Sequence, residues 1–574
     1  MSSIQLSCSA TPFIGQKGRK QFAPVHIQTA GGSGFPTGAL CFVRVWFVTS
    51  SKPVFSIQDI TGLWTRVTNP AGETGVESFS SFNPVGTTCD FIAFGSFFDP
   101  NDLTAPDAYT ATYRVEVTDD SPQRNVIDSR PVQLLGSATA TQPMSVIFAL
   151  DHGGSMGTPD SPGVTRLARL QAAFPAGTAL LRPEDSVGVV GFGNLNCTPD
   201  VPVALALASS TQKGLANDFA RLLQVDDSFP PQKPIQVGLE RARAMSQTAT
   251  VVLVTDGENN NTPGHKLVKP LLPTSALLIT SAVPPQPNYN ILVSTTGEYA
   301  FASAPLGSFA IEKLLAQILV GIGGGSIISD PEGSLEAGGE ISFPLQLTEA
   351  DRELEVIVLS DDADAIEVHF EGLKVPSPPH HPEPHSHVAA HQPEKPRVDR
   401  DKRYVITRLS VPELPEKERP FNPKVVISRS RKASHCGTLV RYNLIVAAKS
   451  DLKFDAQVTR SGTTVGSELL FSAVLSEYGQ ALHSVNTRVR VELSHPDGFS
   501  QTLELQSTPG ARGRFQASLR SFRPGFYTAH FIATGQSLLH ERAFRRELVR
   551  TSAVSEASGC CEPEQSWDCI FTRT

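Results

Sequence analysis

Three oxygen-bearing side chains follow two apolar runs of the sequence, at the point where each run ends. Asp151 and Ser155 come after the run at residues 146–150, and Asp256 follows the run at residues 251–255. If both runs are parallel strands of one sheet, their carboxyl ends share the edge where open α/β sheets place their sites. Mg²⁺ takes about six oxygen ligands and keeps several waters. These residues therefore predict a candidate site for a divalent cation.

The elements that would position these residues alternate between strand and helix from residue 144 onward. We expect strands at residues 145–150, 186–192, 250–255 and 275–281, and helices at residues 164–181, 211–223, 235–245 and 308–320. The first strand is a continuous apolar run, as in a parallel sheet that is buried on both faces. The helices carry apolar residues at near-helical spacing. The alternation predicts a central α/β doubly wound, Rossmann-like domain.

Sequence typical of β-structure flanks this central segment on both sides. Alternating runs such as residues 109–117 and 488–493 predict short strands separated by turns. We therefore expect a multidomain chain with β-sandwich domains at both ends. The predicted boundaries are 1–140 for an N-terminal β-sandwich, 141–325 for the α/β domain, 326–453 for a β-rich domain, 454–554 for an immunoglobulin-like β-sandwich, and 555–574 for a cysteine-containing tail.

The Pro- and His-rich segment and the cysteines indicate structural roles rather than metal or redox sites. Residues 376–396 contain seven prolines and five histidines, and the prolines favour an exposed loop over a zinc or nickel site. The eight cysteines are sparse for 574 residues and have no paired C-x-x-C framework. They indicate reduced thiols rather than a disulfide scaffold.

Composition narrows the classes of partner and the expected location. A net charge of −8 offers no basic face for DNA or RNA. No run approaches the 18 or so apolar residues of a membrane span, and the first residues lack the pattern of a secretory signal. We therefore expect a protein partner, no nucleic acid and no membrane span. The expected location is cytoplasmic, with the cell surface or a signal-independent route of secretion as the alternative.

Residues 144–322 resemble a von Willebrand factor type A (vWA) domain. The resemblance rests on Asp151-x-Gly-x-Ser155 after the first strand, on the second strand at residues 186–192, and on Asp256-Gly-Glu258 after a later strand. It implies an adhesion function through a metal-ion-dependent adhesion site (MIDAS). In that family an Asp-x-Ser-x-Ser motif, a threonine from a separate loop and a distal aspartate surround Mg²⁺ or Mn²⁺.

The sequence departs from this family pattern at two of the expected ligands. Gly153 replaces the first serine, and Lys233 or Pro234 stands where the threonine is expected. Glycine and proline have no side-chain oxygen, and protonated lysine has no acceptor. Buried carboxylates without a counter-charge are costly, so we expect Lys233 to pair with Asp151 and Asp256 in place of the ion. Binding of Mg²⁺ or Mn²⁺ is then expected to be weak or lost.

These observations favour a non-enzymatic protein that binds a partner through the top face of the vWA-like domain, with an acidic residue of the partner if an ion is held. The residues expected to contact the partner are His152, Lys233, Asn259, Asn260 and Asn261. A first alternative is a structural subunit of a larger assembly that self-associates. A simpler interpretation of the cluster is that Asp151 or Ser155 only caps a helix.

A second alternative is a serine hydrolase. The sequence Gly-Gly-Ser155-Met-Gly satisfies the G-x-S-x-G nucleophile elbow, and Asp256 followed by His265 gives the chain order of an α/β-hydrolase triad. An elbow normally follows several βα units, whereas here β-rich sequence precedes it directly. The short motif therefore carries less weight than its context.

Overall fold

The computed structural model describes most of the chain from residue 143 to residue 554, and the strands of the first 142 residues by their backbone. Within the first 142 residues it describes the strands between residues 5 and 137; the other described ranges are 143–161, 163–193, 201–226, 234–256, 274–280, 298–303, 309–373, 397–411, 423–430, 439–462, 464–477, 480–482, 486–508, 513–537 and 541–554. The predicted loop at 376–396 and the tail at 555–574 lie outside these ranges.

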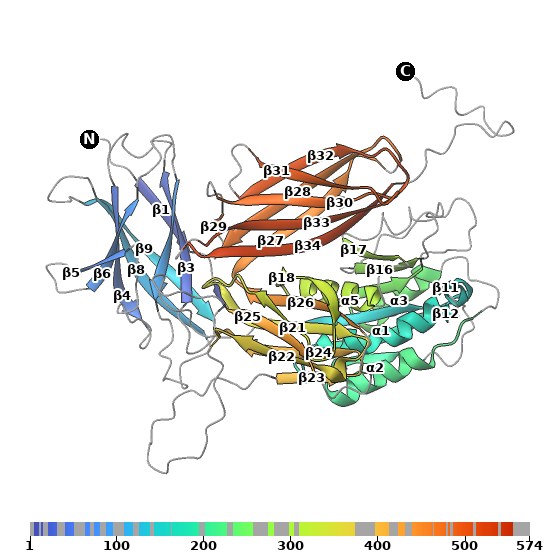
Figure 1. Ribbon diagram of the computed structural model, residues 1–574. Helices are drawn as coiled ribbons and strands as arrows, with labels where there is room; N and C mark the ends of the chain where they lie inside the picture. The colour runs from blue at the N-terminus through green and yellow to red at the C-terminus, as the bar shows by residue number, and fades with distance from the viewer. Residues whose placement is uncertain are drawn as a thin grey trace, which may run out of the picture.

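The N-terminal part is built of strands, as expected (Figure 1, blue). They form a three-stranded sheet of order β1-β3-β7 and a six-stranded sheet of order β2-β9-β8-β4-β6-β5. The strands are β1 Gln5–Ala10, β2 Phe13–Ile14, β3 Gln21–Ala30, β4 Cys41–Ser50, β5 Trp64–Thr68, β6 Thr74–Ser80, β7 Thr88–Gly95, β8 Ala108–Thr118 and β9 Val126–Ser137.

The central part is a six-stranded sheet of order β14-β13-β10-β15-β16-β17. All neighbouring strands run parallel except β13 and β14. The strands are β10 Ser145–Asp151, β13 Ser186–Phe192, β14 Val203–Leu207, β15 Thr250–Thr255, β16 Thr274–Thr280 and β17 Glu298–Ser303. The helices are α1 Arg166–Leu180, α2 Ser210–Leu222, α3 Pro234–Met245 and α5 Ala310–Ile322. Short elements η2 Gly154–Gly157, β11 Pro159–Ser161 and β12 Val164–Thr165 connect β10 to α1.

Both faces of strand β10 are buried, which explains its continuous apolar sequence. Its alternate residues point to opposite faces of the sheet. Phe148 lies in one hydrophobic core with residues of α1, α2 and α5, while Ile147 lies in a second core with residues of α3. Helices therefore cover the sheet on both sides. The short strands β14 and β17 were not predicted.

The described residues after α5 are mostly β-structure, and the multidomain, mostly β architecture is as expected. A 14-stranded sheet runs through this region in the order β23-β24-β21-β26-β18-β34-β33-β30-β31-β32-β28-β27, with β19 on β26 and β29 on β28; a second sheet has the order β20-β25-β22. The first set of strands is β18 Gly325–Ser329, β19 Glu332–Leu335, β20 Glu340–Pro344, β21 Asp351–Ser360, β22 Ile366–Glu371, β23 Arg397–Asp401, β24 Tyr404–Ser410, β25 Lys424–Arg429 and β26 Val440–Ser450. The second set is β27 Leu452–Arg460, β28 Glu468–Glu477, β29 Gln480–Ala481, β30 Arg488–Ser494, β31 Ser500–Ser507, β32 Arg514–Arg520, β33 Gly525–Gln536 and β34 Ala543–Val554. The predicted boundary between residues 453 and 454 falls inside β27.

Strand β18 connects the central α/β unit to the β-structure that follows it. Helix α5 ends at Ile322, and Gly324 follows with φ +67°, a left-handed conformation that glycine adopts without penalty. Strand β18 then begins at once and pairs with β26 on one side and with β34 on the other. The glycine-rich segment after α5 is therefore a helix stop that leads directly into a sheet.

The α/β unit and the following β-rich unit share one hydrophobic core. Figure 1 shows α1 and α5 beside strands β21, β24 and β26. The core that surrounds α1 and α5 contains residues from these three strands, namely Ile357, Leu359, Ile406, Ile445 and Ala447. Because apolar burial is the main favourable term in folding, this shared core ties the two units together.

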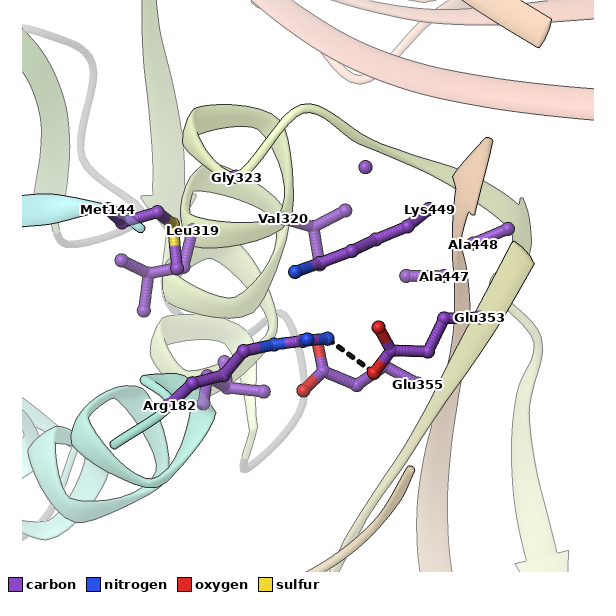
Figure 2. A pocket seen from close by; sticks show the side chains of 12 residues that line it. Met144, Arg182, Leu319, Val320, Gly323, Glu353, Glu355, Ala447, Ala448 and Lys449 are labelled. Atoms are coloured by element: carbon purple, nitrogen blue, oxygen red, sulfur yellow. Dashed lines mark hydrogen bonds and ion pairs between the residues drawn. The ribbon is translucent and has the colours of Figure 1, made fainter. Parts of the chain in front are cut away.

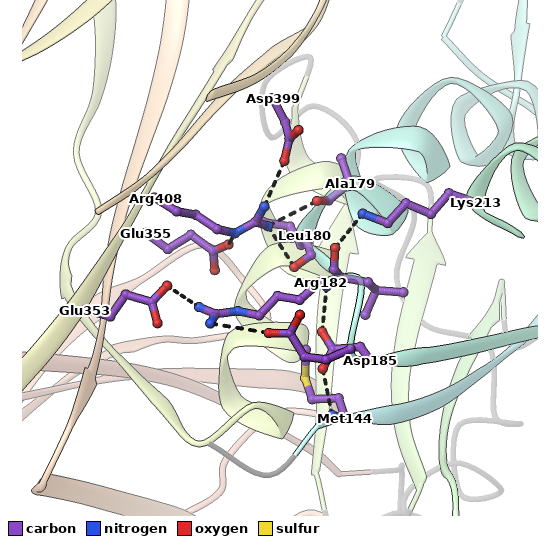
Figure 3. A network of polar contacts seen from close by, with 12 residues as sticks. Met144, Ala179, Leu180, Arg182, Asp185, Lys213, Glu353, Glu355, Asp399 and Arg408 are labelled. Atoms are coloured by element: carbon purple, nitrogen blue, oxygen red, sulfur yellow. Dashed lines mark hydrogen bonds and ion pairs between the residues drawn. The ribbon is translucent and has the colours of Figure 1, made fainter. Parts of the chain in front are cut away.

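A network of polar contacts reinforces the same junction (Figure 3). The Arg408 guanidinium donates to Glu355 at 2.6 Å and to Asp399 at 2.8 Å. It also donates to the carbonyl oxygens of Ala179 at 3.1 Å and Leu180 at 2.9 Å. These carbonyls belong to the C-terminal turn of α1, where a cation opposes the negative end of the helix dipole. Arg408 thus fixes the end of α1 to β21 and β23.

A small pocket opens at this junction, between α5 and strands β21 and β26 (Figure 2). Arg182 reaches across it to Glu353, with 2.5 Å between Nη2 and Oε1. The Lys449 side chain points into the same space, and burial together with the positive charge of Arg182 lowers its pKa. The polar groups of the pocket are thus part of the contact between the two units.

The C-terminal strands are attached to the β-rich unit by buried charge pairs. Arg546 donates to Asp351 at 2.5 Å, and both side chains are fully buried. Arg542 donates to Glu349 at 2.6 Å in the same region. These contacts hold the start of β21 and the residues just before it against the start of β34. Among the described residues, no helix is both long and apolar enough to cross a membrane.

Candidate functional site

The fold brings the two predicted carboxylates together at one edge of the central sheet. Asp151 is the last residue of β10, and Asp256 directly follows the last residue of β15. The two strands are parallel neighbours in which Leu150 is paired with Val254. Asp151 and Asp256 are 4% and 2% exposed. The edge therefore holds two buried carboxyl groups, as the sequence predicted from the ends of the strands.

Hydrogen bonds engage both oxygens of the Asp151 carboxylate. The Gly153 backbone N–H donates to Oδ1 at 2.9 Å, and the Thr255 hydroxyl donates to Oδ2 at 2.5 Å. Burial and the negative charge of Asp256 raise the pKa of Asp151 to about 7, against the effect of these two hydrogen bonds. A carboxyl group in this position is close to the balance between its charged and neutral forms at neutral pH.

Asp256 is paired with an arginine from the first turn of α1. The Arg166 guanidinium donates to Asp256 Oδ2 at 2.9 Å, and the two side chains are 5% and 0% exposed. Helix α1 begins where the Thr165 hydroxyl accepts the Ala168 N–H at 3.1 Å, an N-cap that fixes the first turn. The cap thereby places Arg166 beside the sheet edge.

His152 and Ser155 take different positions at this edge. His152 was expected on the surface that contacts a partner, but its side chain is buried, with the residue 3% exposed. Its Nδ1 lies 3.1 Å from the Gln224 carbonyl oxygen, and its backbone N–H donates to the Phe192 carbonyl at 3.0 Å. The expectation of a surface histidine is wrong, because the imidazole packs inside the loops. Ser155 lies in η2 and is half-buried.

The remaining predicted site residues lie outside the described part of the chain. They are Lys233, Asn259, Asn260 and Asn261, together with His265 of the hydrolase alternative. A cation does lie beside the carboxylates, and among the described residues it comes from Arg166. Sequence reasoning missed Arg166 and Thr255. Thr255 stands immediately before Asp256 at the end of the same strand, so the position at the strand end could have indicated it. Arg166 belongs to no recognisable motif.

The described residues at this edge do not fit a divalent cation. Both oxygens of Asp151 accept hydrogen bonds, and Asp256 accepts from a guanidinium. Gly153 offers no side-chain oxygen. Within the described ranges, no group of three or more His, Cys, Asp and Glu side chains is gathered as a metal ion would require. The arrangement resembles an internal ion pair more than an open cation site with water ligands.

Of the hydrolase triad, the described residues include Ser155 and Asp256, while His265 lies outside them. The carboxylate of such a triad holds a histidine in its working tautomer. Asp256, which the alternative assigned to that role, accepts instead from Arg166. The Ser155 carbonyl accepts the Thr158 N–H at 3.0 Å and closes the short turn after β10.

Comparisons with known proteins find distant structural likeness only. No family model matches the chain, and no curated protein matches it. Among solved structures, a von Willebrand factor type A protein from Catenulispora acidiphila is 12% identical with a TM-score of 0.25, covering 64% of this chain and 66% of that one. The pilus adhesin SpaC from Lactobacillus rhamnosus GG is 12% identical with a TM-score of 0.27, covering 80% of this chain and 59% of that one.

A third structure is proximal thread matrix protein 1 from the mussel byssus, with a zinc-occupied MIDAS motif. It is 13% identical with a TM-score of 0.24, covering 34% of this chain and 50% of that one. The chain thus spans less than two thirds of the length of each of these three structures.

Proposed function

We propose that this chain is a non-enzymatic interaction protein of the adhesion type, which binds a protein partner at the carboxyl edge of the central sheet. The unit that carries this edge would be a doubly wound, vWA-like domain. One observation carries the proposal. The charged groups at the edge, Asp151, Asp256 and Arg166, are buried and bonded to one another or to neighbours, so they support the edge rather than react with a substrate.

The rim of the same edge is available for a partner. Thr158 and Pro159, which follow η2, are exposed, and Val164 is 40% exposed. A rigid scaffold with contact residues on its connecting loops is a common arrangement for binding sites. The predicted contacts Lys233, Asn259, Asn260 and Asn261 lie outside the described residues and remain part of this proposal.

Photocrosslinking tests where the partner binds. A photoreactive amino acid is placed at Thr158, on the proposed face, or at Thr248, an exposed threonine at the amino end of β15. The two sites are at opposite ends of the parallel strands. We expect one discrete protein adduct from the Thr158 position and none from the Thr248 position. Equal labelling from both positions, or from neither, contradicts binding at this edge.

A fluorophosphonate probe tests the enzymatic alternative. The proposed function predicts no labelling of Ser155, because Asp256 is engaged by Arg166. Labelling of the parent that disappears in Ser155→Ala would overturn the non-enzymatic assignment.

A second candidate function is a structural subunit of a larger assembly. The shared core around α1 and α5 and the Arg408 network favour it, since they make the α/β unit and the β-rich unit one continuous body. Sedimentation velocity over a hundredfold range of concentration tests this candidate. A concentration-dependent shift toward larger species supports self-assembly, and a constant monomer contradicts it.

A further inference from the structure

We propose that Arg166 is a built-in counter-ion that takes the place of a divalent cation at the carboxyl edge of the central sheet, so that this edge is complete without metal. The inference goes beyond the proposed function, because it concerns how the charge of the edge is balanced. It holds whether or not a partner binds there.

The first argument is the charge that the fold places inside the protein. Asp151 and Asp256 lie at the ends of two adjacent strands, and their exposed fractions are 4% and 2%. Two carboxylates at such a position repel each other and have lost their hydration, so the fold requires a positive charge or strong donors beside them. Arg166 meets this requirement with an almost fully buried guanidinium, 2.9 Å from Asp256 Oδ2.

The second argument is the position of Arg166 in helix α1. A cation in the first turn of a helix faces the positive end of the helix dipole and is unfavourable there. The first turn of α1 contains no acidic residue that would offset it. The Asp256 carboxylate, although 90 residues away in sequence, lies where it neutralises the guanidinium. The pairing with Asp256 therefore gives Arg166 its physical reason to be buried at this point.

The carboxylate oxygens that a metal ion would need as ligands are already engaged by protein donors. Thr255 and Gly153 donate to the two oxygens of Asp151, which orients both toward protein donors. An ion that bound Asp256 in addition would lie beside the guanidinium and be repelled by it. The same residues that would attract a cation are thus already satisfied by hydrogen bonds and by one fixed positive charge.

The test combines a metal titration with a double-mutant cycle on the full chain. The parent, Arg166→Met, Asp256→Asn and the double variant are stripped with chelator. Each is then followed by thermal unfolding, with and without Mg²⁺ or Mn²⁺ at millimolar concentration, and by calorimetric titration with the same ions. Arg169→Met is the matched control, since Arg169 lies three residues further along α1 and is less buried.

We expect no heat of binding and no change in Tm of the parent with either ion. Arg166→Met should unfold about 5 °C below the parent and below Arg169→Met, because it removes the guanidinium that donates to the buried Asp256. The double variant should recover part of that loss, which shows that the two side chains act as a pair.

Two results would overturn the proposal. One is binding of Mg²⁺ or Mn²⁺ by the parent with a micromolar Kd that Asp256→Asn abolishes. The other is an Arg166→Met variant as stable as Arg169→Met. If Arg166→Met does not fold, the titration of the parent and of Asp256→Asn still decides, because metal binding by the parent contradicts a site that Arg166 completes.

Discussion

The Thr255 hydroxyl is the shortest contact to the carboxylate at the end of β10, and its removal is the simplest test of that site. Thr255→Val keeps the shape of the side chain but removes the donor to Asp151. A buried acceptor that loses its partner costs about 1 to 3 kcal/mol. We expect a loss of this size in the free energy of unfolding, measured by urea denaturation.

The control for this substitution is Thr255→Ser, which keeps the hydroxyl and loses only a methyl group. It should be less destabilising than Thr255→Val. If the serine variant loses more stability than the valine variant, the methyl packing of Thr255 matters more than its hydrogen bond to Asp151.

At the residue scale the sequence predicted which carboxylates meet, but not what neutralises them. Asp151 and Asp256 follow apolar runs, and parallel strands bring such ends to one edge. The Arg166 contact depends on the direction in which α1 leaves its N-cap, which no local pattern encodes. The burial of His152 was missed for a similar reason, since it results from loops that close over the strand end.

At the element scale, the C-terminal end of α1 depends on Arg408. Arg408→Met keeps much of the apolar stem but removes the donor to Glu355, Asp399 and two helix carbonyls. Breaking a largely buried charge network of this kind should cost about 3 kcal/mol in the free energy of unfolding. Chemical denaturation measures the loss.

Arg441→Met provides the matched comparison, because Arg441 pairs with Asp361 at the surface, where the side chains are 58% and 36% exposed. A surface pair contributes at most about 1 kcal/mol. Equal losses in the two variants would contradict a structural role for the Arg408 network.

We expect the stability of the protein to depend on pH through Asp330, which lies between β18 and β19. Burial raises the pKa of Asp330 to about 6, although Lys313 lies 3.1 Å away and opposes the shift. The folded protein therefore binds this proton more tightly than the unfolded chain, and the stability contributed by Asp330 falls as the pH rises from about 4 to about 6. The total change is at most about 3 kcal/mol, since one pKa unit corresponds to about 1.4 kcal/mol.

Denaturation midpoints of the parent and Asp330→Asn between pH 4 and pH 7 test this expectation. As the pH rises, the denaturation midpoint of Asp330→Asn should increase relative to that of the parent. Parallel profiles would show that Asp330 has the same proton affinity in the folded and unfolded states.

The strands and helices of the central unit could largely be predicted from sequence. Continuous apolar runs located β10, β13 and β15, and helical spacing located α1, α2, α3 and α5 within two residues. Strand β14 was missed because it has five residues and an edge position, so its Val-Ala-Leu-Ala-Leu sequence is too short to show a period. Propensity gives little information about such short segments.

At the scale of the whole molecule, the shared core predicts that the α/β unit and the β-rich unit unfold together. Ile406 in β24 is fully buried in the core around α1 and α5. Ile406→Ala should cost about 2 to 5 kcal/mol, and hydrogen exchange should accelerate in α1 and β10 as well as in β21 and β24. Mass spectrometry of peptides from these elements measures the effect.

Leu493→Ala is the comparison for this experiment, because Leu493 is fully buried in a separate core among the C-terminal strands. Its effect should be largest in β28, β30 and β33. If Ile406→Ala accelerates exchange in β21 and β24 alone, the two units unfold independently.

The association of these units could not be predicted from sequence. The sequence predicted strands on both sides of residues 453 and 454 but not their pairing, and one sheet runs from β23 through β18 to β27. The pairing of a strand across units depends on partners far apart in the chain, and nothing in the local sequence of β18 distinguishes a sheet centre from a sheet edge.

The place of β18 also sets an order of events during synthesis. Its partner in β34 emerges from the ribosome about 220 residues later, since Ile327 is paired with Glu547. Until then one side of β18 has no permanent neighbour, and contacts of such long range form slowly. A nascent or truncated chain that ends before β34 therefore presents an uncovered strand edge, which is a site for aggregation or for a chaperone.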